Sequence, residues 1–199
     1  ETLVANAEAA LKKAKRSRER FLFYAREMNA RAAVLLKLEN QLRKAVRQDE
    51  FVLYYQPRVL LGTQQIVGLE ALIRWKSPEL GLVTPADFIP LLEETGLILD
   101  VGRWAFHRAV ADRERWRARG CAVPSIGVNV SAIELRQKDF IEQIRGAFVC
   151  PDRPEDAFEI ELTESMIMSD VEGSAAKLRE VRAAGIKIGI DDFGTGYSS

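Results

Sequence analysis

Hydrophobic residues recur three and four positions apart in two N-terminal stretches, which predicts two helices. The first covers residues 2–16 and is defined by Leu3, Ala7, Ala10, Leu11 and Ala14. The second covers residues 26–48 and carries the stripe Leu35, Leu38, Leu42 and Ala45. This stripe is too short for a coiled coil and favours core packing, with a linker helix that carries a signal between domains as the alternative. Between the two helices, Arg20–Tyr24 predicts a short strand.

From residue 51 the pattern changes to short apolar strands separated by helical stretches. The predicted strands are Phe51–Pro57, Ile66–Trp75, Ser125–Ser131, Ala157–Thr163 and Ile186–Asp191. The predicted helices are 85–95, 98–118, 139–149 and 171–184. About eight residues join the first two strands, which is too few for a parallel crossover, so this pair is predicted to be antiparallel. The alternation that follows predicts an α/β fold with a mostly parallel sheet covered by helices.

Alternation along each strand separates an apolar face from a polar face. The apolar faces are predicted to pack under helices, and Ile126, Val128 and Val130 are an example. The polar faces converge on five residues, most of them at or near the carboxyl ends of strands, namely Glu70, Arg74, Asn129, Glu161 and Asp191. In an α/β barrel these ends form the catalytic rim. Asp192 and a loop rich in glycine and hydroxyl groups follow Asp191.

Several carboxylates on one rim would repel one another unless cations lie between them. One or two divalent metals would balance this charge, with Asn129 as a neutral oxygen ligand. Because His107 is the only histidine and Cys121 and Cys150 lack metal-ligand spacing, Mg, Mn or Ca is favoured over Zn. Arg74 suits an anionic substrate oxygen. The set suggests attack of a metal-activated water on a phosphodiester.

Composition limits the remaining possibilities. Lys plus Arg and Asp plus Glu each number 29 in 199 residues, so the formal net charge is zero. This balance argues against general binding to nucleic-acid polymers or membrane surfaces. The chain has no apolar run near the roughly 18 residues that a membrane span needs. Cysteine usage favours a reduced, cytoplasmic setting.

Each candidate residue also has a structural interpretation. Glu70 could serve only as a partner for Arg74, and Asn129 could satisfy backbone groups between strands. Glu161 could belong, with Glu159, to the solvated face of an edge strand. The Asp191–Asp192 pair could simply start a turn. His107 is expected to be structural, and Trp104, Phe106 and Trp116 are expected to serve helix packing rather than a stacking platform.

Six segments of residues 37–199 resemble, in order, the motifs of EAL-type cyclic di-GMP phosphodiesterases. They are Tyr54-Tyr55-Gln56-Pro57, Glu70-Ala71-Leu72-Ile73-Arg74, Asp87-Phe88-Ile89-Pro90, Asn129-Val130-Ser131, Glu161-Leu162-Thr163-Glu164-Ser165 and Asp191-Asp192-Phe193-Gly194-Thr195-Gly196-Tyr197-Ser198-Ser199. The resemblance implies a TIM-like barrel with an antiparallel first strand. It also implies hydrolysis of cyclic di-GMP to pGpG with Mg or Mn. A non-catalytic cyclic di-GMP receptor is the alternative function.

The resemblance also assigns roles to residues. It implies that Glu70, Asn129, Glu161, Asp191 and Asp192 bind metal and carry the catalysis. Gln56, Leu72 and Arg74 are implied to contact the dinucleotide. Glu164 is implied to steady the loop after Asp192, a loop that the family also uses for homodimer contacts.

The domain organisation is predicted from the same likeness. Residues 1–24 resemble the C-terminal tail of a GGDEF (diguanylate cyclase) domain, residues 25–36 form a helical linker, and residues 37–199 form the first two-thirds of an EAL domain. Upstream GGDEF or sensor domains are therefore expected partners. Since a TIM barrel needs eight strands and about five are predicted here, we expect the 199-residue piece to form an incomplete barrel and to be inactive alone. Ile186, Ile188 and Ile190 would then be exposed beside an open sheet edge.

Overall fold

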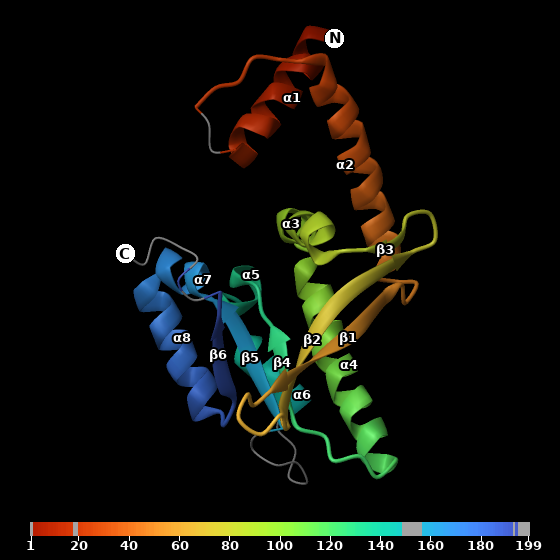
Figure 1. The fold of residues 1–199 in the computed structure, drawn as a ribbon. Coiled ribbons are helices and arrows are strands. Elements are labelled where there is room, and N and C mark those ends of the chain that lie inside the picture. Colours follow the sequence, from red (N-terminus) through yellow and green to blue (C-terminus); the bar gives the residue numbers. More distant parts are fainter. Residues whose placement is uncertain (1, 18–19, 149–156, 193, 195–199) are drawn as a thin grey trace. The chain divides into compact units, whose positions relative to one another are not determined.

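The chain folds into two units, Glu1–Arg47 and Gln48–Ser199. The structure is a computed structural model, and it describes residues 2–17, 20–148, 157–192 and 194 (Figure 1). Among these residues, no helix is long and apolar enough to cross a membrane. Cys150 and most of the loop after Asp192 lie outside the described residues.

The N-terminal unit consists of two helices, α1 (Thr2–Ser17) and α2 (Arg26–Ala45), which pack against each other. Ala10 and Ala14 on α1 are buried, in agreement with the helical stripe. Both predicted helices are confirmed, although α2 ends at Ala45 rather than at residue 48. The predicted boundary at residue 37 lies inside α2.

The strand predicted at Arg20–Tyr24 is wrong. Residues 20–25 form neither helix nor strand, and no described strand pairs with them. A strand depends on a hydrogen-bonded neighbour, which a short apolar run does not supply. Instead, the rings of Phe21 and Phe23 contact each other edge to face, with centroids 5.9 Å apart.

The second unit is built on a mixed sheet. Its strands are β1 (Phe51–Val59), β2 (Ile66–Ser77), β3 (Gly81–Val83), β4 (Ser125–Asn129), β5 (Phe158–Thr163) and β6 (Lys187–Asp191). The order across the sheet is β1-β2-β4-β5-β6, and β3 pairs with β2. β1 is antiparallel to β2, whereas β2, β4, β5 and β6 are mutually parallel neighbours. The antiparallel opening and the parallel remainder are thus confirmed, and β3 is a sixth strand that the sequence pattern did not predict.

The helices of this unit are α3 (Pro85–Thr95), α4 (Ile98–Ala118), α5 (Ala132–Leu135), α6 (Phe140–Phe148), α7 (Glu164–Ser169) and α8 (Val171–Ala183). Four match predicted helices closely, whereas α5 and α7 were not predicted. α5 begins directly after β4 because the Ser131 side chain and Glu134 form a reciprocal capping box. This cap ends the strand at Asn129, two residues earlier than predicted.

The core lies between the apolar face of the sheet and helices α4, α6 and α8. Ile126 and Val128 on β4, together with Ile160 and Leu162 on β5, belong to one buried cluster. The helices contribute further members, which are Phe106, Phe140, Ile144 and Val181. Within this cluster Ile186 is only 4% exposed, so its predicted exposure is wrong; Ile190, by contrast, is 55% exposed. One face of the sheet is therefore covered by helices over most of its area, and the other carries the polar residues.

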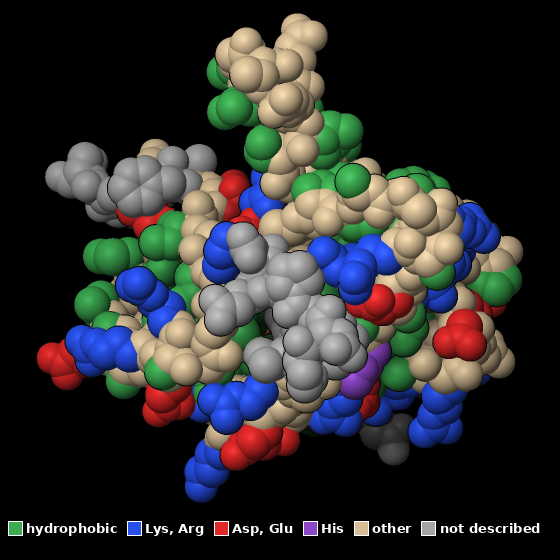
Figure 2. Space-filling model, turned by 90° about the horizontal axis from the view of Figure 1, so that it is seen from below, with side chains coloured by type: hydrophobic (Ala, Val, Ile, Leu, Met, Phe, Trp, Pro, Cys, Tyr) green, Lys and Arg blue, Asp and Glu red, His purple; other side chains and the backbone are tan. Residues whose placement is uncertain are grey.

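Two structural expectations about side chains outside this face can be checked. The Trp116 ring packs on Tyr55 and the Trp104 ring on Phe51, with centroids 4.7 and 6.1 Å apart, which confirms packing roles for these indoles. His107 is exposed on α4. On the face seen from below, Lys and Arg side chains are interspersed with Asp and Glu rather than gathered in one basic patch (Figure 2).

Candidate functional site

The strand register brings the predicted polar residues onto one face of the sheet. Gln56 on β1 lies opposite Glu70 on β2, and Glu70 lies beside Gly127 on β4. Asn129 lies beside Glu161 on β5, and Asp191 on β6 lies beside Thr163. Because paired residues of neighbouring strands point to the same side, Glu70, Asn129, Glu161 and Asp191 share the face that helices leave open. The register confirms that these four residues lie on one face of the sheet, as the alternation predicted.

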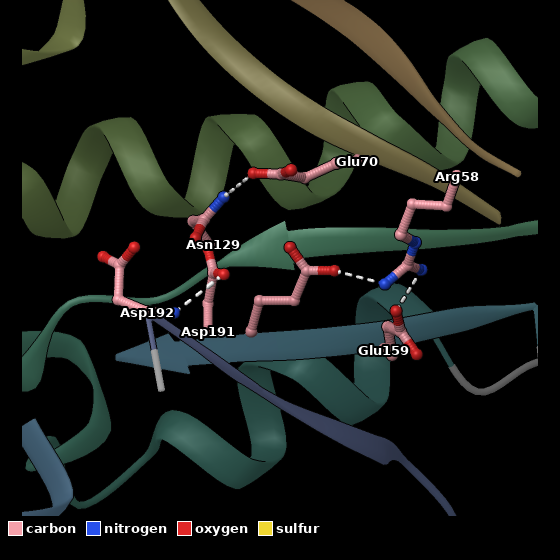
Figure 3. A network of polar contacts seen from close by, with 7 residues as sticks. Arg58, Glu70, Asn129, Glu159, Asp191 and Asp192 are labelled. Atoms are coloured by element: carbon pink, nitrogen blue, oxygen red, sulfur yellow. Dashed lines mark hydrogen bonds and ion pairs between the residues drawn. The ribbon is translucent and has the colours of Figure 1, made fainter. Parts of the chain in front are cut away.

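Glu70 and Asn129 are joined by a hydrogen bond across the open face of the sheet. The Asn129 amide nitrogen Nδ2 donates to Glu70 Oε1 over 3.0 Å and links β4 to β2 (Figure 3). Arg74 is occupied elsewhere, since its Nη1 donates to the Ile73 carbonyl over 2.8 Å. The interpretations of Glu70 as a partner for Arg74 alone, and of Asn129 as a backbone partner only, are therefore not supported.

Arg74 and the neighbouring predicted ligand contacts lie on the β1–β2 part of this face. The Arg74 guanidinium lies over the Tyr54 ring, 5.9 Å from its centroid. Gln56 is exposed and Leu72 is half-buried. This arrangement offers an amide, an apolar side chain and a cation next to Glu70, a combination suited to a nucleotide phosphate and base.

Glu161 is the most buried carboxylate of the face, with its side chain only 6% exposed. β5 lies between β4 and β6, so Glu161 does not belong to an edge strand, and that interpretation is wrong. The pKa of Glu161 is raised to about 7, mainly by burial; the Arg58 charge opposes this rise, and the nearby Glu70 and Glu159 contribute to it. A carboxylate in such surroundings is stabilised by a cation.

Glycines on both neighbouring strands make room for Glu161. A Cβ atom added to Gly127 on β4 would lie 2.0 Å from Glu161 Oε1. A Cβ atom added to Gly189 on β6 would lie 3.3 Å from Glu161 Cγ. The carboxylate therefore lies flat on the sheet because both flanking positions lack a side chain.

Asp191 and Asp192 end β6 in an exposed turn. Asp191 Oδ1 accepts a hydrogen bond from the Asp192 amide over 2.8 Å. Asp192 has a φ of 55°, in the left-handed region. Glu164 Oε2 accepts from the Gly194 amide over 2.8 Å, so Glu164 on α7 contacts the loop after Asp192. This contact is the one that its predicted stabilising role requires, and the role itself stays a prediction.

The donor set is chemically suited to a hard divalent cation. Glu70, Glu161, Asp191 and Asp192 offer carboxylate oxygens, and Asn129 offers an amide oxygen, as Mg and Mn prefer. Within the residues that the structure describes, no three His, Cys, Asp or Glu side chains are gathered closely enough to hold a metal ion as they stand. Metal binding would therefore draw these side chains together from one shared face.

Sequence reasoning missed Arg58. Its guanidinium forms ion pairs with Glu159 and with Glu161, the latter with Nη1 2.7 Å from Oε1 (Figure 3). Alternation does place Arg58 on the same face as Gln56 and Tyr54. The signal that could have found it is the glycine opposite, Gly68, which leaves space for a long side chain.

Comparison with known proteins identifies the family. The sequence model of the EAL domain matches residues 39–199. The chain belongs to the EAL domain family. This EAL chain is 39% identical, over 198 residues, to the bifunctional diguanylate cyclase/cyclic di-GMP phosphodiesterase MucR of Pseudomonas aeruginosa, covering 99% of this chain and 29% of that protein. It is 35% identical, over 204 residues, to the cyclic di-GMP phosphodiesterase PdeR of Escherichia coli, covering 99% of this chain and 30% of that protein.

A solved EAL structure supports the fold. The MucR phosphodiesterase from P. aeruginosa in complex with c-di-GMP superposes with a TM-score of 0.76 at 39% identity, covering 82% of this chain and 66% of that chain. The EAL chain spans less than a third of the length of the curated relatives described above. The family and its α/β fold are thus shown, and the activity of the whole protein is a matter for proposal.

Proposed function

We propose that the protein carrying this EAL domain hydrolyses cyclic di-GMP to linear pGpG with Mg or Mn. The observation that carries the proposal is the family match over residues 39–199, in which Glu70, Asn129, Glu161 and Asp191 share one sheet face. Relatives named as cyclic di-GMP phosphodiesterases support the substrate. The net charge of zero agrees with a small anionic ligand held locally rather than a nucleic-acid polymer.

The proposal assigns the metal to oxygen ligands of the open face. Glu70, Asn129, Glu161 and Asp191 would hold one ion, and Asp192 would take part at a second position. When bound, the ion would lower the pKa of a coordinated water and neutralise charge on the phosphodiester. Asn129 Nδ2 already holds Glu70 in place, so its amide oxygen is directed away from that contact.

The remaining side chains would bind and orient the dinucleotide. Arg74 would face a phosphate oxygen, because its guanidinium lies on the same face and its planar donors match the geometry of a phosphate. Gln56 and Leu72 would contact the dinucleotide beside it. Hydrolysis then opens one of the two phosphodiester linkages: the water oxygen bonds to phosphorus as it loses a proton, the bond from phosphorus to a sugar oxygen breaks, and that oxygen takes up a proton to leave as a hydroxyl.

Glu164 would hold the loop after Asp192. Its hydrogen bond to the Gly194 amide supports this role, since the bond ties α7 to the backbone that follows the metal-binding aspartates. We also propose that this loop contributes to a homodimer.

Three further features of the protein are proposed from the same likeness. Residues 1–24 would be the tail of a GGDEF domain, and the bifunctional relative that aligns with 99% of this chain supports this. Residues 25–36 would link it to the EAL domain. The protein would act in the cytoplasm, where upstream GGDEF or sensor domains would control it.

The test is product formation by the full-length protein. Cyclic di-GMP is incubated with Mn or Mg, and the products are separated by liquid chromatography. We expect linear pGpG with either metal and none after chelation by EDTA. Binding of cyclic di-GMP by calorimetry without turnover in either metal would reject the enzyme and leave the receptor function.

A further inference from the structure

Arg58 crosses the open face of the sheet to reach β5. It starts on β1, opposite Gly68 of β2, and ends at two carboxylates separated from β1 by β2 and β4. Nη1 lies 2.7 Å from Glu161 Oε1, and Nη2 pairs with Glu159. Figure 3 shows the guanidinium lying between β1 and Glu159. One side chain therefore connects the first strand to a proposed metal ligand.

The path of Arg58 depends on a missing side chain. A Cβ atom added to Gly68 would lie 2.7 Å from Arg58 Nε and 2.8 Å from Nη2. These distances are shorter than carbon and nitrogen atoms tolerate without a shift. Gly68 therefore allows the guanidinium to lie against the sheet.

Arg58 balances a charge that would otherwise be costly. Glu161 is nearly enclosed, and Glu70 and Glu159 lie close enough to act on it as like charges. Removing the partner of a buried charge costs more than the pair contributes. Since a guanidinium stays charged, Arg58 gives Glu161 a permanent counter-charge. The same Glu161 oxygens are those that the proposed function assigns to a divalent metal.

A guanidinium and a divalent ion compete for these oxygens. Nη1 occupies Glu161 Oε1, and a metal ion near that oxygen would be repelled by the charge of Arg58. Glu159 gives Arg58 a second carboxylate on the same strand, which it can keep when Glu161 is withdrawn. The two ion pairs thus provide one contact that metal binding breaks and one that it leaves intact.

We propose that Arg58 is a built-in counter-charge for Glu161, which is displaced from Glu161 when a divalent metal binds and so sets the metal affinity. This inference rests on the proposed function in taking Glu161 as a metal ligand. Arg58 acts through Glu161 and is a positioning residue rather than a catalytic one. A purely structural ion pair makes the opposite prediction, because loss of Arg58 would then disorder Glu161 and weaken metal binding.

The experiment measures Mn affinity by isothermal titration calorimetry in the full-length protein. Arg58→Met is expected to tighten binding about tenfold, because a neighbouring positive charge is removed. Gly68→Ala changes no charge but pushes the guanidinium away from its path, so it is expected to tighten binding in the same direction by about threefold. Arg119→Met, at the exposed position directly after α4, removes one positive charge that is not among the described ion-pair partners of Glu161, and it is expected to change affinity less than about twofold.

If Arg58→Met does not fold, Gly68→Ala still tests the inference, because it displaces the Arg58 guanidinium without removing its charge. Unchanged or weaker Mn binding in Gly68→Ala and Arg58→Met overturns the inference, and so does absence of Mn binding in every variant. Hydrolysis of cyclic di-GMP by the wild-type protein is measured separately. Turnover with unshifted affinities rejects only the role of Arg58. The expected shifts without turnover reject only the proposed activity.

Discussion

The two faces of the central sheet are made by the same strands and follow different rules. On the helix-covered face, Ile126 and Ile160 are fully buried and belong to one hydrophobic cluster. On the open face, Glu161 is almost as buried but lies between Gly127 and Gly189 and pairs with Arg58. The covered face is stabilised by the packing of apolar side chains. The open face depends on ion pairs and on glycines that leave space for the charged side chains. Substitutions on the covered face should therefore lower the free energy of unfolding, whereas substitutions on the open face should lower metal affinity or activity.

The largest effect is expected from Glu70→Gln on the open face. The change removes one proposed ligand charge while keeping the size of the side chain and an acceptor for Asn129. We expect the rate of cyclic di-GMP hydrolysis to fall at least about a thousandfold, equivalent to about 4 kcal/mol. The free energy of unfolding in urea should change by less than about 1 kcal/mol. A comparable loss of stability would contradict the division between the faces.

Ile160→Ala tests the covered face. Ile160 is fully buried, and its truncation should lower the free energy of unfolding by about 3 kcal/mol through lost burial and the cavity left behind. Urea denaturation followed by circular dichroism measures this. Metal affinity of the folded fraction should stay within about twofold, since the side chain points away from Glu161. A large specific loss of metal binding would show that the faces are coupled.

Gly127→Ala adds a methyl group beneath Glu161. Because its Cβ would lie 2.0 Å from Glu161 Oε1, the carboxylate must move, at a cost of about 2 kcal/mol in stability. The metal affinity of Gly127→Ala, measured by calorimetry, should fall as well, because the displaced carboxylate is a proposed metal ligand. Gly146→Ala on α6 is the matched control, since its Cβ would have no atom within 4 Å. It should be neutral or slightly stabilising, and an equal loss in both variants would reject the steric explanation.

Glu134 on α5 is a buried carboxylate that lies outside the open face of the sheet. It therefore tests whether buried charge affects stability away from the proposed site. Burial raises its pKa to about 7, although hydrogen bonds from Ser131 oppose the rise. The unfolded chain releases this proton near the ordinary value of 4.5 and the native state only near 7. The stability that Glu134 contributes is therefore full below pH 4.5 and lost as pH rises through about 7.

Glu134→Gln should remove this dependence. At pH 8 the variant should be more stable than wild type by about 1 kcal/mol, and near pH 5 the difference should largely vanish. Thermal unfolding at both pH values measures it. A variant that is less stable at pH 8 would show that the capping box outweighs the buried charge.

Much of the fold could be predicted from the sequence because alternation and helical spacing are local patterns. They located four helices of the sheet unit and the antiparallel β1–β2 pair. They did not find β3, α5 or α7, which are three to six residues long. The Ser131–Glu134 capping box was a readable signal for α5. The wrong strand at Arg20–Tyr24 shows the limit of the method, since pairing depends on a partner elsewhere in the chain.

The candidate site, like the fold, was predicted from the sequence only in part. Alternation placed Glu70, Asn129, Glu161 and Asp191 on one face, and the register confirms it. Their roles as metal ligands stay predictions. Arg58 was missed because its reach to β5 depends on strand order, which no local pattern contains. The expected exposure of Ile186 failed for a related reason: the helices cover that end of β6.

The glycines on either side of Glu161 have a consequence for the interpretation of genetic variation. A survey of all single substitutions would find Gly127 and Gly189 intolerant, with activity profiles close to those of the acidic residues. Yet neither glycine offers a side-chain atom to a ligand. A ranking by loss of activity alone would count them among the reactive groups, whereas their contribution is to leave space for the Glu161 carboxylate against the sheet.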